Sequence, residues 1–274
     1  MDSVSRESYT AAVVRLDGLV TGGGAVALAG VADEILSVAL LLAKQPRLRR
    51  ALADPSRPAE DRAGLLGSIV DGKVSDDAAT LLRTLVGGRW SSSAELLTAA
   101  ERLGVEALLG SSQSAGELAE VEDELFRFGQ VVDGDNELAA VLGATSVPVP
   151  QRSALAHSLL DQKARATTVR LVDVALQGFG GRNFAASLSR MVELAAERRD
   201  RQIAYVTVAS ALTDADETRL ADRLGRMYGR AVEIKVTVDP TVLGGVSVRI
   251  GHDLYDATVL RRLKETRTAL VGRK

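Results

Sequence analysis

A recurring four-residue pattern decides the expected fold: Asp33-Glu34-Ile35-Leu36 aligns with Asp123-Glu124-Leu125-Phe126 at an offset of 90 residues. Further positions agree at the same offset: Leu48 with Leu138, Leu52 with Leu142, Pro58 with Pro148, Ser68 with Ser158, Asp71 with Asp161, Lys73 with Lys163, Leu81 with Leu171, and Gly88 with Gly178. Chance matches of Ala and Leu are frequent in this composition, but several matches of Pro, Asp, Lys and Gly at the same offset are not expected by chance. Self-similarity at a fixed period is typical of a repeated structural unit. The sequence therefore predicts two tandem copies of one helical unit.

The spacing of apolar residues extends this prediction along the chain. Three- and four-residue spacings predict helices almost throughout from residue 3 to about residue 200. We expect one helical unit over 1–108 and a second over 91–200, with the helix at 91–109 closing the first copy and opening the second. The segment Gly110 to Gly116 contains three serines and is expected to be the most flexible connection between the copies.

The period changes after residue 200. Ile203–Val208 is β-branched and aromatic, and 232–238 and 246–250 alternate apolar with polar residues, so all three are predicted strands. Helices are expected from Thr213 to Tyr228 and again after residue 256. The expected fold class is α+β, with tandem all-helical bundle units followed by a small α/β C-terminal domain over 201–274.

Composition excludes several classes of site. The chain has 274 residues, with 34 Lys and Arg against 36 Asp and Glu, and a net charge of −2 argues against nonspecific nucleic-acid binding. It has no cysteine and two histidines, which excludes a disulfide framework and thiolate or His-rich metal sites. We therefore expect no metal and no cofactor. The near-zero net charge favours apolar grooves as binding surfaces.

No segment is expected to cross a membrane. The most apolar stretch, Val31 to Ala43, contains Asp33 and Glu34 and is far short of the roughly 20 apolar residues that a spanning helix needs. The N-terminus carries Asp2 and Glu7 and does not resemble a secretory signal. We expect a cytoplasmic protein, although a surface docked on a membrane complex would leave no such trace.

One motif approaches a phosphate-binding loop. Gly67 to Val74 has the spacing Gly-x4-Gly-Lys, but Val74 stands where a hydroxyl must reach the metal, and the preceding segment is helical where a strand is required. At the repeat offset the two glycines fall on His157 and Gln162. A helix end is the favoured interpretation, and an enzyme that uses this loop is the rival hypothesis.

Other polar groups are also interpreted structurally. His157 lies in a predicted helix with no metal-ligand spacing, and His252-Asp253 is typical of a turn. The run from Arg198 to Arg201 is expected to be a solvated helix end, with contact to an acidic partner as the alternative. None of these groups supplies a nucleophile, a base and an orienting residue together. The residues alone predict a protein that binds other proteins rather than an enzyme.

The segment from Val238 to Gly251 resembles the signature of the delta subunit family of the F-type ATP synthase, the counterpart of the mitochondrial oligomycin-sensitivity-conferring protein. The signature positions are Asp239, Leu243, Gly244, Gly245, Val246, Val248, Arg249 and Gly251. Physically, Asp239-Pro240 turns the chain out of a strand and the Gly pair permits a tight return, so a β-hairpin is expected. The resemblance covers roughly Ser91 to the C-terminus, and residues 1 to 90 form an extra copy of the helical unit.

The resemblance implies a non-catalytic stator subunit at the cytoplasmic face of the cell membrane, peripheral and without direct insertion. In this family the helical domain holds N-terminal helices of the alpha subunits, and the C-terminal region holds the b subunit of the peripheral stalk. The alpha subunits belong to the catalytic head of the synthase. The resemblance places the contact with this head on the first and fifth helices of a copy. In copy one these carry Tyr9, Ala12, Val13, Leu16, Leu81, Leu82 and Leu85; in copy two, Leu96, Ala99, Ala100, Leu103, Leu171, Val172 and Ala175. Which copy binds the head stays open. The alternative function is a generic helical adaptor unrelated to the synthase.

Overall fold

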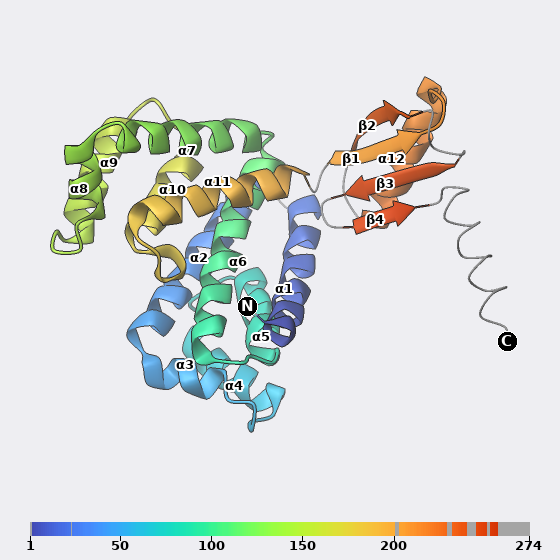
Figure 1. Cartoon of the computed structure of the whole chain (residues 1–274). Helices are drawn as coiled ribbons and strands as arrows, with labels where there is room; N and C mark the ends of the chain where they lie inside the picture. Colours follow the sequence, from blue (N-terminus) through green and yellow to red (C-terminus); the bar gives the residue numbers. More distant parts are fainter. Residues whose placement is uncertain are drawn as a thin grey trace, which may run out of the picture. The chain divides into compact units, whose positions relative to one another are not determined.

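The computed structural model describes residues 2–22, 24–200, 203–228, 232–239, 245–250 and 253–256. The chain forms two compact units, Met1–Ala195 and Ala196–Lys274, which are considered one at a time below. Figure 1 shows a helical unit and a smaller unit built on a β-sheet. The predicted fold class, helical units followed by a small α/β domain, is confirmed.

The helices of the first unit fall into two series. The first is α1 (Ser3–Gly22), α2 (Ala25–Lys44), α3 (Pro46–Leu52), α4 (Ala59–Val70), α5 (Asp76–Gly87) and α6 (Ser93–Ser114). The chain continues through α7 (Leu118–Asp133), α8 (Asn136–Gly143), α9 (Val149–Leu160), α10 (Ala166–Leu176), the short 3-10 helix η1 (Phe179–Gly181) and α11 (Phe184–Asp200). Helices α6 to α11 repeat α1 to α6 at the offset seen in the sequence, so α6 ends one series and begins the next. Because α11 ends at Asp200, it crosses the boundary between the two compact units.

The Glu of the repeated Asp-Glu pair has the same structural role in both copies. The carboxylate of Glu34 accepts hydrogen bonds from the amide and the hydroxyl of Ser75, at 3.0 and 2.6 Å, where α5 begins. In copy two, Glu124 accepts from the amide of Arg165 at 2.9 Å and from the hydroxyl of Thr168, where α10 begins. Amides at a helix N-terminus lack partners within the helix and attract negative charge. The repeat therefore preserves an interhelical cap as well as a residue pattern.

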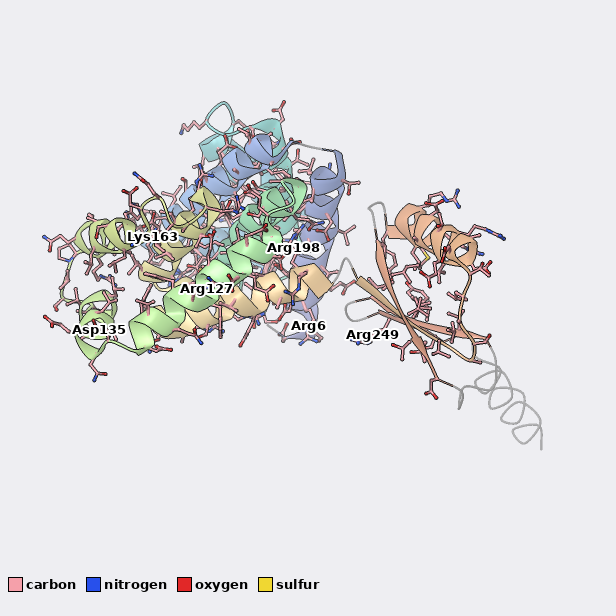
Figure 2. All side chains as sticks on the ribbon, turned by 90° about the horizontal axis from the view of Figure 1, so that it is seen from above. Arg6, Arg127, Asp135, Lys163, Arg198 and Arg249 are labelled. Carbon is pink, nitrogen blue, oxygen red and sulfur yellow. The ribbon has the colours of Figure 1, made fainter. Side chains whose placement is uncertain are left out.

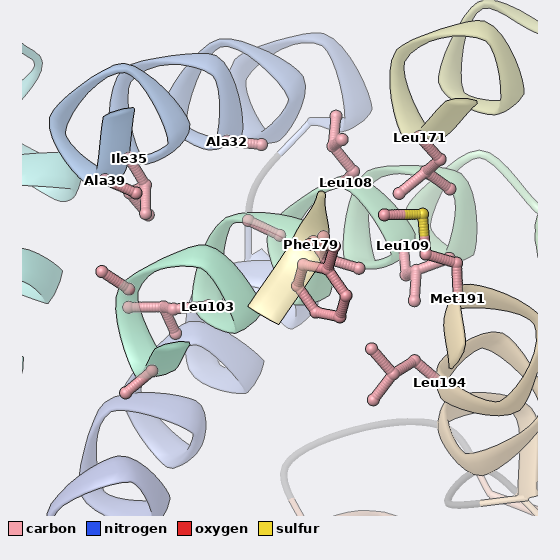
Figure 3. Packing of buried hydrophobic residues seen from close by; sticks show 14 of the residues in the cluster. Ala32, Ile35, Ala39, Leu103, Leu108, Leu109, Leu171, Phe179, Met191 and Leu194 are labelled. Carbon is pink, nitrogen blue, oxygen red and sulfur yellow. The ribbon is translucent and has the colours of Figure 1, made fainter. Parts of the chain in front are cut away.

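Helix α6 lies at the centre of the helical unit. Ten consecutive residues, Leu103 to Ser112, are buried, and almost three turns of helix are thereby covered on every side. Its neighbours include α1, α2, α3 and α5 from copy one and α7, α10 and η1 from copy two. Figure 3 shows Leu103, Leu108 and Leu109 of α6 among core side chains of α2, α10 and α11. The two copies consequently share one hydrophobic core.

The expected flexible connection at Gly110 to Gly116 is wrong. Helix α6 continues to Ser114, and the small residues in this segment let neighbouring backbone approach. The hydroxyl of Ser111 donates to the carbonyl of Ala25 at 2.8 Å, and that of Ser114 donates to the carbonyl of Val20 at 3.0 Å. These serines bond to the backbone at the end of α1 and the start of α2 and do not form a flexible linker. The turn comes later, at Gly116, whose φ of +74° suits glycine.

Helix α2 could cross a membrane by length and composition, and it is the one helix among the described residues that meets this test. It has 20 residues and a most-apolar window with a mean hydropathy of 2.0. Its Ala32, Ile35 and Ala39 pack into the core of the helical unit (Figure 3). Since Glu34 also caps α5 from this helix, we assign α2 as a core helix.

The second unit holds a four-stranded sheet. Its elements are β1 (Ile203–Val208), α12 (Asp214–Tyr228), β2 (Glu233–Val238), β3 (Val246–Ile250) and β4 (Asp253–Asp256). The strand order is β2-β1-β3-β4, with β1 parallel to β2 and antiparallel to β3. Val206 pairs with Val236 on one side and Val248 on the other, and this apolar row packs in one core with Leu224 of α12.

The expected β-hairpin at the signature is wrong. Strands β2 and β3 are consecutive in the chain, but β1 lies between them. The crossover through α12 makes β2 parallel to β1, which leaves the other edge of β1 for β3. Strand β4, which the sequence pattern did not reveal, pairs antiparallel with β3. The expected helix after residue 256 lies outside the described residues.

Candidate partner-binding surfaces

The predicted head-contact residues of copy one lie mainly on the inner side of α1. Tyr9, Ala12 and Leu16 are buried in the core, and Val13 is half-buried. The opposite side of α1 faces solvent and carries exposed Val4, Ala11, Val14 and Gly18. The fifth-helix residues Leu81, Leu82 and Leu85 are buried as well. In copy one, therefore, the predicted contact residues lie mainly in the core, and the solvent-facing side of α1 carries other residues.

The corresponding residues of copy two are fully buried. Leu96, Ala99, Ala100 and Leu103 of α6 are each 0% exposed, because α6 is the central helix. Leu171, Val172 and Ala175 of α10 are buried in the same core. Helices α1 and α6 are equivalent in the repeat, but only α1 has a continuous solvent-facing side. Whether any of these residues touches the head stays a prediction.

The signature residues that the structure describes are Asp239, directly after β2, Gly245, directly before β3, and Val246, Val248 and Arg249 in β3. Gly245 has φ +87°, a left-handed conformation that favours glycine. Val248 is buried, Val246 is half-buried and Arg249 is exposed, as alternation along a strand requires. The amide of Asp239 donates to the carbonyl of Val208 at 2.8 Å, which fastens the end of β2 to the end of β1. Leu243, Gly244 and Gly251 lie outside the described residues.

The phosphate-loop spacing at Gly67 to Val74 forms the end of a helix. Gly67 lies within α4, Gly72 has φ +73° in the following turn, and the ammonium of Lys73 donates to the carbonyl of Ile69 at 2.9 Å. Gln162, at the Gly72 position of copy two, also has a positive φ, of 54°. The turn geometry is therefore a property of the repeat, and no strand precedes the loop to make a nucleotide cradle.

His157 joins α9 to α10. Its Nε2 lies 2.9 Å from Oδ2 of Asp173, and the hydroxyl of Ser153 donates to the same carboxylate. A catalytic relay needs the imidazole between the hydroxyl and the carboxylate, with a different ring nitrogen toward each. Here the carboxylate is central, and the same Nε2 faces both Ser153 and Asp173. The arrangement agrees with the structural role expected for His157.

The expected solvated helix end from Arg198 to Arg201 is wrong for Arg198, which is only 1% exposed, whereas Arg199 is exposed as predicted. Arg198 continues the buried side of α11, where Met191, Leu194 and Ala195 precede it at helical spacing. Across the described residues, no group of three or more His, Asp or Glu side chains could hold a metal ion.

The net charge of −2 conceals two units of opposite sign. Residues 1–195 contain 19 Lys and Arg against 25 Asp and Glu, a net charge of −6, whereas residues 196–274 contain 15 against 11, a net charge of +4. Counting the whole chain missed this separation; counting each predicted domain would have found it. The two units thus suit partners of different charge.

Glu101 of α6 is a partly buried carboxylate that bonds to a backbone amide of η1. Its Oε2 accepts a hydrogen bond from the amide of Gly180 at 2.8 Å. Burial raises the pKa of Glu101 above its ordinary value of 4.5, although the Gly180 amide and the charges of Arg182 and Arg49 act in the opposite direction. Between pH 4.5 and the raised pKa, Glu101 keeps in the folded chain a proton that it has lost in the unfolded chain.

We predict that Glu101→Gln raises the free energy of unfolding relative to wild type, and that the increase depends on pH. The free energy of unfolding of the wild-type chain falls as pH rises from 4.5 through the raised pKa, because ionisation of the buried carboxyl opposes folding. The uncharged amide escapes this loss and can still accept from Gly180. Urea unfolding at pH 4 and pH 7 should show the variant gaining stability relative to wild type at the higher pH. An equal difference at both pH values would contradict the prediction.

Comparisons with known proteins agree on one family. The family model described as ATP synthase delta (OSCP) subunit matches residues 105–270. The chain is 60% identical over 271 residues to ATP synthase subunit delta of Salinispora arenicola (strain CNS-205), covering 99% of both chains. It is 40% identical over 272 residues to ATP synthase subunit delta of Streptomyces griseus subsp. griseus, covering 99% of this chain and 100% of that relative. It is also 35% identical over 270 residues to ATP synthase subunit b-delta of Mycobacterium sp. (strain KMS), covering 98% of this chain and 61% of that relative.

Proposed function

Because the chain belongs to the ATP synthase delta (OSCP) subunit family, and is thus a non-catalytic peripheral-stalk subunit of the F-type ATP synthase, we propose that it joins the N-terminal segments of the alpha subunits to the b subunit. The complex links hydrogen ion transport to ATP synthesis, and this subunit is peripheral to its membrane part. A generic adaptor unrelated to the synthase is not favoured, since the full-length relatives carry the delta name. We place the subunit at the cytoplasmic face.

The head contact is proposed on α1 of copy one. A partner helix needs an accessible surface with apolar or small residues at helical spacing. Val4, Ala11, Val14 and Gly18 provide this spacing on the solvent-facing side of α1, and Val14 is 66% exposed. The observation that carries the proposal is the contrast with the equivalent helix α6, which is buried throughout Leu103 to Ser112.

The b-subunit contact is proposed on the second unit. The mycobacterial relative is named b-delta, and this chain matches 61% of its length. The unit has a net charge of +4, and α12 exposes Arg219, Arg223 and Arg226 at spacings of four and three residues, which align on one side of a helix. A row of guanidinium groups suits a partner segment rich in carboxylates.

Val14→Asp in the full-length chain tests the head contact. A buried charge at the centre of an apolar helix contact should weaken binding of a synthetic alpha N-terminal peptide at least about tenfold by isothermal titration calorimetry. Val131→Asp is the matched control, because Val131 is 56% exposed on α7. Equal loss in both variants, or no loss with Val14→Asp, would overturn the assignment to α1.

A further inference from the structure

An open groove lies between the two copies of the helical unit. Helix α2 of copy one forms one wall, and α10 with η1 of copy two forms the other. The groove encloses a volume of about 260 Å³, and its apolar lining includes Leu36, Leu40, Val174 and Phe179. Leu40 is 42% exposed, so an apolar side chain is accessible at the groove. Because its walls come from different copies, a single helical unit could not form this groove.

The polar lining of the groove is predominantly acidic. Asp33, Glu101 and Asp173 contribute carboxylates, of which Asp173 also bonds to Ser153 and His157, and Glu101 to the Gly180 amide. Arg170 contributes the single cation among the described lining residues. Nη2 of Arg170 lies 3.3 Å from Oδ2 of Asp33, which links the two walls. The surrounding unit has a net charge of −6, so the wider field also attracts a cation.

The volume argues for a side chain rather than a free metabolite. Pockets for drug-sized ligands range from about 300 to 1,000 Å³, so a space of about 260 Å³ suits one or two side chains of a partner. Lys and Arg combine an apolar stem with a charged head, and this combination matches leucines beside carboxylates. Arginine is also common among the few residues that dominate binding energy at protein interfaces.

We propose that this groove, between α2 and α10 with η1, receives a Lys or Arg side chain, flanked by aliphatic residues, from a segment of the catalytic head. The inference rests on the proposed function, which assigns the acidic helical unit to the head and the basic second unit to the b subunit. It adds a second head contact that depends on the duplication and is separate from the outer side of α1.

The repeat supplies matched control positions for the groove. Leu40 corresponds to Gln130 and Ser37 to Arg127, on the equivalent side of α7. Figure 2 labels Arg127 on this helix. All four residues are exposed, but no third copy faces α7 among the described residues, so the equivalent surface has only one wall. The paired positions share a place on the helix and differ in the presence of the groove, although their natural side chains differ and Arg127 also forms an ion pair with Asp123.

The first experiment measures binding of the full-length chain to purified catalytic head by biolayer interferometry. Leu40→Arg places a guanidinium of the chain itself beside the groove carboxylates, where it competes with the incoming cation. We expect at least about tenfold weaker binding for Leu40→Arg and less than about twofold change for Gln130→Arg. Thermal unfolding of both variants checks that the helical unit remains folded.

The second experiment measures coverage directly and does not depend on affinity. The natural chain has no cysteine, so Ser37→Cys and Arg127→Cys each introduce a single thiol. Maleimide labelling of Ser37→Cys should slow at least about tenfold when the head is bound, because an occupied groove blocks access to the thiol. Labelling of Arg127→Cys should be unchanged.

The outcomes separate the two proposals. If the wild-type chain does not bind the head, the proposed function fails. If it binds, but Leu40→Arg binds as tightly as Gln130→Arg and Ser37→Cys stays fully reactive, the groove inference is overturned and the α1 contact stands. If Val14→Asp and Leu40→Arg each weaken binding, both contacts are supported.

Discussion

Leu108→Ala is expected to lower the free energy of unfolding of the helical unit by about 4 kcal/mol, because it leaves a cavity in a core that cannot close around it. Leu108 is 0% exposed and lies in the fully buried part of α6. Helices of both copies pack around α6, so collapse at this position would require several helices to move together. The loss should therefore lie toward the upper end of the range for Leu to Ala changes.

Guanidinium chloride unfolding, followed by circular dichroism at 222 nm, measures this effect. Since α6 belongs to both series of helices, the helical unit should unfold in one transition that moves as a whole. Val26→Ala, at a side chain that is 88% exposed, should change stability by less than about 0.5 kcal/mol. Two separate helical transitions, only one of which responds to Leu108→Ala, would contradict the shared core.

Gly104→Leu should cost about 3 kcal/mol through overpacking. A Cβ atom added at Gly104 would lie 2.6 Å from Cγ and Cδ2 of Leu36, in the contact between α6 and α2. A leucine side chain at this position would have to enter the close contact between these two helices. Glycine at residue 104 thus sets how near α2 lies to α6.

Gly30→Leu is the control for helix propensity. Gly30 lies on α2 with nothing within 4 Å of an added Cβ, so leucine there should stabilise the chain by roughly 0.5–1 kcal/mol. Denaturation midpoints of the two variants should move in opposite directions. A stabilising Gly104→Leu would show that α2 can move away from α6 without loss.

Much of the fold could be predicted because it depends on local periodicity. The spacing of apolar residues identified the helices, and the repeat identified the two copies, although the interhelical caps that Glu34 and Glu124 form at Ser75 and Arg165 were seen only in the structure. The prediction for Gly110 to Gly116 failed because small residues are common in two different structures. Glycine and serine from Gly110 to Gly116 are typical of a linker, but in a close helix contact they allow tight approach and bond to neighbouring carbonyls.

The candidate site was less predictable, because periodicity finds the apolar side of a helix but cannot tell what covers it. Leu96, Ala99 and Leu103 fit a groove pattern as well as a core pattern, and the central position of α6 makes them core. Arg198 shows the reverse error, since a charge at a helix end can still follow the buried side. Similarly, the sequence pattern identified β1, β2 and β3 but not that β1 lies between β2 and β3 in the sheet.

The sequence by itself determined the duplication, the helical period, the β-rich end of the chain and, through the signature at Asp239 to Gly251, the family. Tertiary structure alone decided that α6 is central, that α1 keeps an open side, and that the acidic groove forms between the copies. The physical reason is that propensity and periodicity act within a few turns of one helix. Exposure and a groove with two walls depend instead on segments such as α2 and α10, which are far apart in the chain and meet only after packing.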